Sequence, residues 1–310
     1  MIAAIIDCGT NTFNLLIADF NVHGDYKILL NTKKSVKLAE GGLPQNKIAP
    51  KPFDRGIKTF TEFTKTAKKY KAEVIQAFGT SALRSSLNGP DFVKKVMEKT
   101  GIMIQVLNGD TEAQYIYKGV NLALEDTGKP VLIMDIGGGS TEFIIAKDKQ
   151  VAWKRSFDLG AAKLIEDFGL SDPITQEEEK KLKDHFRETL IPLSSHLKKN
   201  PVDTLIGCSG SFESLADMIN ADKGENPPQA NFYTFDNGDF KRMHQILLES
   251  TEQERREMPG LVEYRVDTIV LASIFIRYVK KRFKIEEMSY SSFALKEGVL
   301  ADLISGKIAL

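Results

Sequence analysis

Two short polar turns, each following an apolar run that ends in aspartate, carry residue types suited to phosphate chemistry. The first is DCGTNT at residues 7–12, and the second is DIGGGST at residues 135–141. Glycines in such turns expose several backbone N–H groups, which bind anions such as phosphate. The Ser and Thr hydroxyls add donors, and each aspartate offers the oxygen ligands that Mg²⁺ prefers. Each turn is therefore predicted to form part of a metal–phosphate site.

The two turns follow one pattern. DCGTNTFNLLIA at residues 7–18 aligns without gaps on DIGGGSTEFIIA at residues 135–146. In each copy an apolar strand leads to an acidic residue, a glycine-containing turn and a second apolar strand. Unrelated β-hairpins also carry Gly and Asn in their turns, and aspartate favours ordinary turns. The favoured interpretation is an internal duplication in which Asp7 and Asp135 have matching functional positions.

Two other phosphate-binding motifs do not match these turns. A P-loop requires Lys directly after its last glycine, and no Lys follows the glycines here. The dinucleotide fingerprint requires G-x-G-x-x-G at the start of a helix, whereas EFIIA at residues 142–146 continues as a strand. The sequence therefore argues against both motifs.

Strand-like and helix-like segments alternate along the chain, which predicts an α/β fold. The predicted strands are 2–7, 73–78, 102–107, 131–136, a strand beginning near 203, and 286–290. The predicted helices are 54–70, 90–99, 110–124, 160–168, 176–198, one after 211, 267–282 and one from 293. Asp110 is expected to cap its helix. The polar segment 125–130 is expected to be a linker, and 220–239 a long surface loop.

The composition restricts the class of protein. The 310 residues include 42 Lys and Arg and 42 Asp and Glu, so no net field attracts a polyanion such as nucleic acid. Cys8 and Cys208 are expected to be reduced, buried thiols of a cytoplasmic protein. The first ten residues lack the basic segment of a signal peptide. No apolar run reaches the ~18–20 residues that a membrane span requires.

Further motifs identify a family. They are FGTSALRSSLNG at 78–89, NGDTEAQYIYKG at 108–119, IGCSGSFESLA at 206–216, EYRVDTIVLAS at 263–273 and SSFALKEGVL at 291–300. Together with the two turns, and in the same order, they resemble the exopolyphosphatase / guanosine pentaphosphate phosphatase family, Ppx/GppA. This family is a branch of the actin, heat-shock-70 and sugar-kinase superfamily. The resemblance extends over nearly the whole chain.

The resemblance implies two actin-like (ribonuclease H-like) domains flanking an active-site cleft. The first domain would comprise residues 1–124 and 298–310, and the second residues 125–297. The implied reaction is hydrolysis with Mg²⁺ or another divalent cation. It would release terminal orthophosphate from polyphosphate or convert guanosine pentaphosphate to the tetraphosphate. Homodimers are common in the family, so a homodimer is expected.

The resemblance also implies roles for individual residues. Glu112 would orient or deprotonate the attacking water, while Asp135 and Glu142 would be catalytic acids that hold the metal. Phosphate would be bound by Asp7, Gly9, Thr10, Asn11, Arg84, Gly137, Gly138, Gly139, Ser140, Ser209, Gly210 and Ser211. Simpler alternatives stay open: Arg84 on a helix surface, Glu112 as a charge at a helix end, and Ser209 as a helix cap.

The chain departs from the family pattern at some positions. Thr111 stands where an acid is often found, Phe293 where Gly is common, and Lys296 where Arg is common. Lysine lacks the bidentate geometry of arginine, so a phosphate contact at position 296 would be weaker. Two other functions stay open: a small-molecule kinase of the same superfamily, and a polyphosphate or alarmone sensor without turnover.

Overall fold

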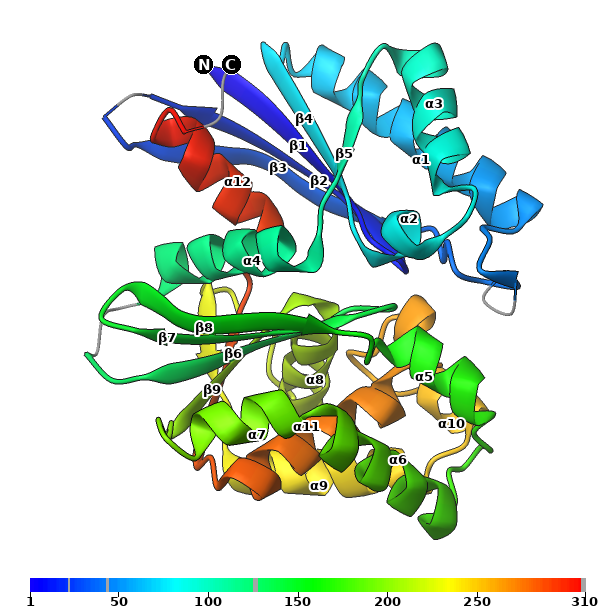
Figure 1. The fold of residues 1–310 in the computed structure, drawn as a ribbon, viewed down its shortest axis with the longest axis vertical. Coiled ribbons are helices and arrows are strands. Elements are labelled where there is room, and N and C mark those ends of the chain that lie inside the picture. Colours follow the sequence, from blue (N-terminus) through cyan, green and yellow to red (C-terminus); the bar gives the residue numbers. More distant parts are fainter. Residues whose placement is uncertain (22, 43–44, 125–127, 308–310) are drawn as a thin grey trace. The chain divides into compact units, whose positions relative to one another are not determined.

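The computed structural model of the chain describes residues 1–21, 23–42, 45–124 and 128–307, and Figure 1 shows their elements. These residues form two compact units. Unit 1 comprises Met1–Leu122, Gly137–Gly139 and Ala294–Leu310, and unit 2 comprises Ala123–Ile136 and Ser140–Phe293. The expected linker at 125–130 lies partly outside the described residues.

Unit 1 is built on a sheet whose strands have the order β3-β2-β1-β4-β5. Strand β2 pairs antiparallel with both β3 and β1. Strand β4 pairs parallel with β1, and β5 pairs parallel with β4. The strands are β1 (Ile2–Cys8), β2 (Thr12–Phe20), β3 (Tyr26–Ser35), β4 (Val74–Gly79) and β5 (Ile104–Val106). The helices are α1 (Pro50–Lys69), α2 (Ser81–Ser85), α3 (Gly89–Thr100), α4 (Gly109–Ala123) and α12 (Leu295–Ile304).

The sheet of unit 1 is covered on both faces. Helices α1 and α3 cover one face, where Phe60 and Phe92 pack into a core with Ile6 and Phe13. Helix α12 covers the other face (Figure 1). This two-sided burial explains why β1 is a nearly continuous apolar run, as buried strands are.

Unit 2 contains a sheet with the order β10-β11-β9-β6-β7-β8. Its strands are β6 (Val131–Ile136), β7 (Thr141–Lys147), β8 (Gln150–Phe157), β9 (Thr204–Cys208), β10 (Phe232–Thr234) and β11 (Glu287–Ser291). Its helices are α5 (Ala161–Phe168), α6 (Gln176–Thr189), α7 (Ile191–Leu197), α8 (Ser209–Asp222), α9 (Asn237–Glu249), α10 (Glu252–Arg256) and α11 (Ile269–Phe283), with a 3₁₀ turn at Glu263–Arg265.

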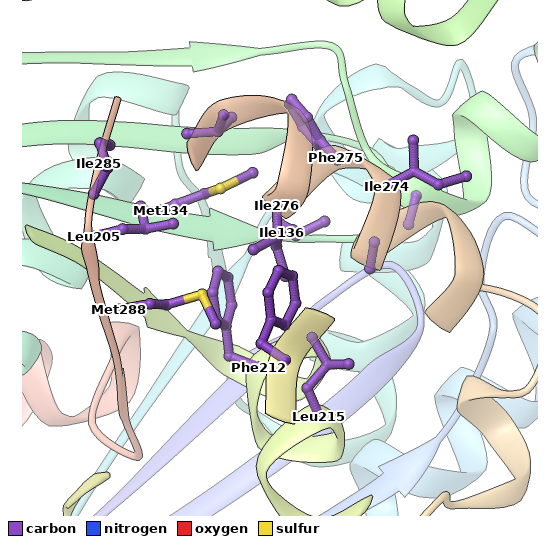
Figure 2. Close-up of a cluster of buried hydrophobic side chains, with 14 of the residues drawn as sticks. Met134, Ile136, Leu205, Phe212, Leu215, Ile274, Phe275, Ile276, Ile285 and Met288 are labelled. Atoms are coloured by element: carbon purple, nitrogen blue, oxygen red, sulfur yellow. The ribbon is translucent and has the colours of Figure 1, made fainter. Parts of the chain in front are cut away.

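Helices α5–α9 and α11 share one apolar core with this sheet, part of which is shown in Figure 2. Met134 and Ile136 alternate along β6 and point into the core, which they share with Phe212 of α8 and Phe275 of α11. Gly207 on β9 makes room for Phe212, since a Cβ there would lie 1.9 Å from the phenylalanine ring. The packing of α8 against β9 therefore depends on this glycine.

The two sheets repeat one topology, as the duplicated sequence predicts. In unit 1 the hairpin β1–β2 continues into β3, and β4 lies parallel to β1 on the other side. In unit 2 the hairpin β6–β7 continues into β8, and β9 lies parallel to β6. The aligned segments 7–18 and 135–146 form equivalent hairpins.

Some local predictions are wrong. The helix expected at 176–198 is two helices, α6 and α7, with a break at Leu190; Pro192 lies in the first turn of α7, where its missing N–H costs nothing. Helix α4 begins before Asp110, and Asn108 Oδ1 instead accepts from the N–H of Thr111. The expected loop at 220–239 contains β10, which pairs with β11.

Cys8 and Cys208 are both buried free thiols. Within the described part of the chain, no helix combines the length and apolar character that crossing a bilayer requires.

We expect Gly298→Ala to destabilise the protein by about 1–3 kcal/mol, the usual cost of overpacking. Helices α4 and α12 approach so closely that a Cβ at position 298 would lie 1.9 Å from the carbonyl oxygen of Tyr115. The midpoint of urea unfolding measures the effect. Gly238→Ala, in the exposed first turn of α9, is the control and should change stability by at most about 1 kcal/mol. Equal midpoints for the two variants would contradict this packing.

Acid is expected to destabilise the protein through His244. Burial, followed by the charge of Arg277, lowers the pKa of His244 from 6.5 to about 4; Lys183 and Lys281 act in the same direction and Glu179 opposes them. The unfolded chain therefore binds more protons between these values, so stability is lost as the pH falls from 6.5 towards 4. Between pH 7 and 4.5, wild type should lose about 2 kcal/mol more unfolding free energy than His244→Gln. Urea unfolding at each pH measures these free energies. Equal losses for wild type and His244→Gln would refute the prediction.

Candidate active site

The residues predicted to form the site are divided between the two units. Unit 1 holds Asp7, Gly9, Thr10, Asn11, Arg84, Glu112 and Gly137–Gly139, and unit 2 holds Asp135, Ser140, Glu142, Ser209, Gly210 and Ser211.

In unit 2, Asp135 and Glu142 lie directly opposite each other on the antiparallel strands β6 and β7. Opposite residues of such a pair project from the same face of the sheet. Both side chains are buried, with 7% and 2% of their surface exposed. Like charges in directly opposite positions are unfavourable, so this arrangement requires compensating donors or a cation.

Serine hydroxyls supply donors to both carboxylates. The Ser209 hydroxyl donates to Asp135 Oδ2 at 2.7 Å, and the Ser156 hydroxyl, from β8, donates to Glu142 Oε1 at 2.6 Å. Ser209 is therefore not the helix cap that was left open above, because its side chain bonds to Asp135 and no side chain caps α8. Its φ of 64° is in the left-handed region, which is rare for residues other than glycine.

The Gly/Ser turn of unit 2 leads from β9 directly into α8, a helix of 14 residues. The first N–H groups of a helix have no partner within it and favour anions. Ser209, Gly210 and Ser211 form this first turn. Their position fits the predicted role in binding phosphate.

Arg265 adjoins the turn and was not among the predicted site residues. Its guanidinium lies against Gly210, where a Cβ would be only 2.0 Å from Nη2. The side chain is buried and its Nε has no hydrogen-bond partner among the described residues. Burial lowers the pKa of Arg265, and Tyr264, Glu213 and Asp135 oppose this shift. The only signal in the sequence was its place in the motif EYRVDTIVLAS.

In unit 1, Glu112 and Arg84 form a close ion pair. Arg84 Nη1 donates to Glu112 Oε2 at 2.8 Å and to the carbonyl oxygen of Leu107 at 2.8 Å. Glu112 is buried in the first turn of α4, where the helix dipole favours a carboxylate. Arg84 is therefore more than a surface helix residue. The predicted contact of Arg84 with phosphate stays a prediction.

The hairpin of unit 1 repeats the geometry of β6–β7 with different chemistry. Asp7 lies opposite Asn14, whose amide donates to Asp7 Oδ2 at 2.9 Å. Asn14 thus occupies the position that Glu142 has in the second copy. Gly9 permits the tight turn, since a Cβ would lie 2.8 Å from the carbonyl oxygen of Thr12. The first hairpin therefore carries one acid where the second carries two.

The backbone of the first turn is held by the segment that follows β3. The carbonyl oxygen of Asn11 accepts from the N–H groups of Val36 and Lys37 at 2.8 and 2.9 Å, and that of Thr10 accepts from Leu38 at 2.7 Å. Thr10 and Asn11 are both buried. The turn is therefore built into unit 1 as a fixed structure.

The departures at the end of the chain have a structural setting. Phe293 is buried, and Lys296 Nζ lies 3.0 Å from Glu297 Oε1 in the first turn of α12. Glu297 Oε2 also accepts from the N–H of Ala294. Lys296 thus neutralises a buried acid.

The carboxylates of Asp135 and Glu142 are oxygen ligands that suit a hard divalent cation, provided that the cation keeps several of its waters. Among the described residues, no group of three or more His, Cys, Asp and Glu side chains is placed to hold a metal. Mg²⁺ needs only one or two carboxylates, with water and substrate oxygens as its other ligands. The pair Asp135 and Glu142 meets that requirement.

Comparison with known proteins identifies the family. The model of the Ppx/GppA phosphatase family matches residues 16–306. The chain belongs to this family. Among curated Ppx/GppA relatives, exopolyphosphatase 1 of Mycobacterium bovis is 28% identical over 297 residues, which cover 96% of this chain and 86% of the relative. The guanosine-5'-triphosphate,3'-diphosphate pyrophosphatase of Vibrio vulnificus is 26% identical over 97% of this chain and 59% of its own length.

Solved Ppx/GppA structures have the same fold. An exopolyphosphatase from Cytophaga hutchinsonii matches with a TM-score of 0.95 and 34% identity, over 99% of this chain and 98% of that one. The PPX-GPPA enzyme of Aquifex aeolicus matches with a TM-score of 0.81 and 26% identity, over 97% and 99% of the two chains. The predicted family and its actin-like α/β fold are thereby confirmed.

Ser209→Ala is expected to be less stable than Ser209→Gly by about 1 kcal/mol, because only glycine adopts a positive φ without strain. Both variants lose the hydroxyl that donates to Asp135. The difference between their stabilities therefore measures the backbone strain of a positive φ. Urea unfolding midpoints of the two proteins measure the difference. An alanine variant as stable as the glycine variant would contradict the strained turn.

Proposed function

We propose that this Ppx/GppA protein is a phosphoanhydride hydrolase. It releases terminal orthophosphate from inorganic polyphosphate, converts guanosine pentaphosphate to the tetraphosphate, or does both. The proposal follows the names of the relatives, exopolyphosphatase and guanosine-5'-triphosphate,3'-diphosphate pyrophosphatase. The observation that carries it is the buried pair of opposite carboxylates, Asp135 and Glu142, on the strands that flank the glycine turn.

On this proposal Glu112 acts on the attacking water. Arg84 holds one carboxylate oxygen of Glu112 through a 2.8 Å contact, so the side chain is oriented before substrate binds. A carboxylate in this position accepts a proton from water as the water attacks phosphorus. Orientation of a single water is much of what catalysis of phosphoryl transfer requires.

The terminal phosphoryl group is bound mainly by backbone N–H groups. In unit 2 these come from the first turn of α8. Asp135 and Glu142 would hold a divalent cation, which neutralises charge on the phosphate oxygens when it is bound. The Ser209 and Ser156 hydroxyls keep the two carboxylates in position. A cytoplasmic location and a homodimer are parts of the proposal.

Glu112→Gln is expected to lower the rate of orthophosphate release by about 10²–10⁴-fold, as loss of a general base does. The purified protein is incubated with Mg²⁺ and either polyphosphate or guanosine pentaphosphate, and released orthophosphate is followed over time. Asp110→Asn is the matched control, because it removes an exposed acid from the same first turn of α4.

Three outcomes would contradict parts of this proposal. Full activity of Glu112→Gln would remove its assigned role. Full activity after chelation of divalent metal would exclude the metal site at Asp135 and Glu142. No release from either substrate, with transfer of phosphate from ATP to a small metabolite, would replace the hydrolase by a kinase.

A further inference from the structure

A cluster of positively charged side chains lies in unit 2, on residues outside the predicted active site. A pocket of about 350 Å³ is lined by Asn237, Phe240, Lys241, Arg277, Lys280 and Lys281. Helices α9 and α11, which supply all six residues, lie side by side in Figure 1. We call this the α9–α11 pocket.

Spacing along α11 gathers the cations on one face. Arg277, Lys280 and Lys281 are three and four residues apart, so their side chains are neighbours on the helix surface. Lys241 adds a fourth positive charge from α9. Four cations therefore surround one small pocket.

None of these cations pairs with an acid among the described residues. Lys280 Nζ donates to the carbonyl oxygen of Glu286 at 3.0 Å. Within the described part of the chain, Lys241, Arg277 and Lys281 form no ion pair. The acids that influence Lys280 and Lys281 have other partners, since Glu179 pairs with Lys183 at 2.6 Å and Glu287 accepts from the Thr204 hydroxyl at 3.0 Å.

The helix dipole does not account for the whole cluster. Cations in the last turn of a helix are stabilised by the dipole, and this covers Lys280 and Lys281 of α11. Arg277 lies before that last turn, and Lys241 is in the second turn of α9, near the end where a dipole disfavours cations. These two residues need another explanation.

The pKa values of Lys281 and His244 are lowered by a positive field that Glu179 offsets only in part. The charge of Arg277 is the main cause that lowers the pKa of Lys281, followed by burial and by Lys183. Arg277 also helps to lower the pKa of His244, after burial. A bound anion would relieve this repulsion.

We infer that the α9–α11 pocket binds a compact phosphoanhydride anion such as tripolyphosphate, whose charges match Lys241, Arg277 and Lys281. Arginine and lysine are suited to phosphate oxygens. Phe240 lines the pocket but is buried, and its ring is stacked on His244, so the pocket presents no open aromatic face to a nucleobase. The choice of a phosphate chain over other compact polyanions rests on the proposed function.

Chemical footprinting of lysines tests the site without any need for turnover. The full chain is acetylated briefly with and without excess tripolyphosphate, with no divalent metal added, and modified peptides are quantified by mass spectrometry. At a tripolyphosphate concentration of about ten times the dissociation constant, the bound anion should slow acetylation of Lys241 and Lys281 about tenfold. Lys198 and Lys199, exposed at the end of α7, serve as internal controls and should be unaffected.

Variants at position 277 add a second measurement. Arg277→Gln should raise the concentration of tripolyphosphate needed for protection about tenfold, as loss of one charged contact does. Arg277→Lys keeps the charge and should retain protection. Sodium chloride at the same ionic strength should not protect either lysine.

The site is refuted if tripolyphosphate leaves Lys241 and Lys281 as reactive as before, or if Lys198 and Lys199 are protected equally. Protection by guanosine triphosphate at much lower concentration than tripolyphosphate would overturn the choice of an inorganic phosphate chain. The two proposals are tested by different measurements. If the protein is not a hydrolase, no orthophosphate is released, but tripolyphosphate still protects Lys241 and Lys281.

Discussion

Two buried carboxylates directly across from each other on neighbouring strands are the constraint on which the site of unit 2 depends. The register of β6 and β7 places Asp135 opposite Glu142. Repulsion between them must be offset, because charges buried without partners are costly. The hydroxyls of Ser209 and Ser156 provide donors. Ser209, the first residue of α8 directly after β9, supplies the first hydroxyl to Asp135, and Ser156 of β8 supplies the second to Glu142.

The duplicated hairpins share a backbone but not a charge pattern. Both place an acid at the end of the first strand and a glycine turn beyond it. The first copy has Asn14 opposite Asp7, and this amide donates to the carboxylate without adding charge. Unit 1 instead obtains its second acid from α4, where Arg84 balances Glu112. One scaffold therefore supports two different arrangements of acids.

The net charge of the chain is zero, but its arginines have contrasting roles. Arg84 is committed to Glu112 and Leu107, which makes it part of the support of a carboxylate. Arg265 is buried against Gly210 without a partner for its Nε among the described residues. Arg277 forms no ion pair within the same residues. Local fields, not net charge, thus determine where this protein can attract anions.

The sequence by itself determined the α/β class, the duplicated hairpins and the family. These depend on patterns along the chain: apolar runs, glycine turns and ordered motifs. Strands β3 and β8 escaped prediction because their residues are only partly buried and lack a clear apolar alternation. The break at Leu190 was missed because the apolar spacing of 176–198 continues through Pro192, although proline at this place starts a new helix.

The tertiary structure alone decided which residues meet. Ser156 reaches Glu142 only because β8 pairs with β7. Arg265 reaches Gly210 from a 3₁₀ turn far along the chain, and Lys241 joins Arg277 through the packing of two helices. Spacing predicts which side chains share a face of one element. It does not predict contacts between distant elements, because these depend on the packing of the whole core.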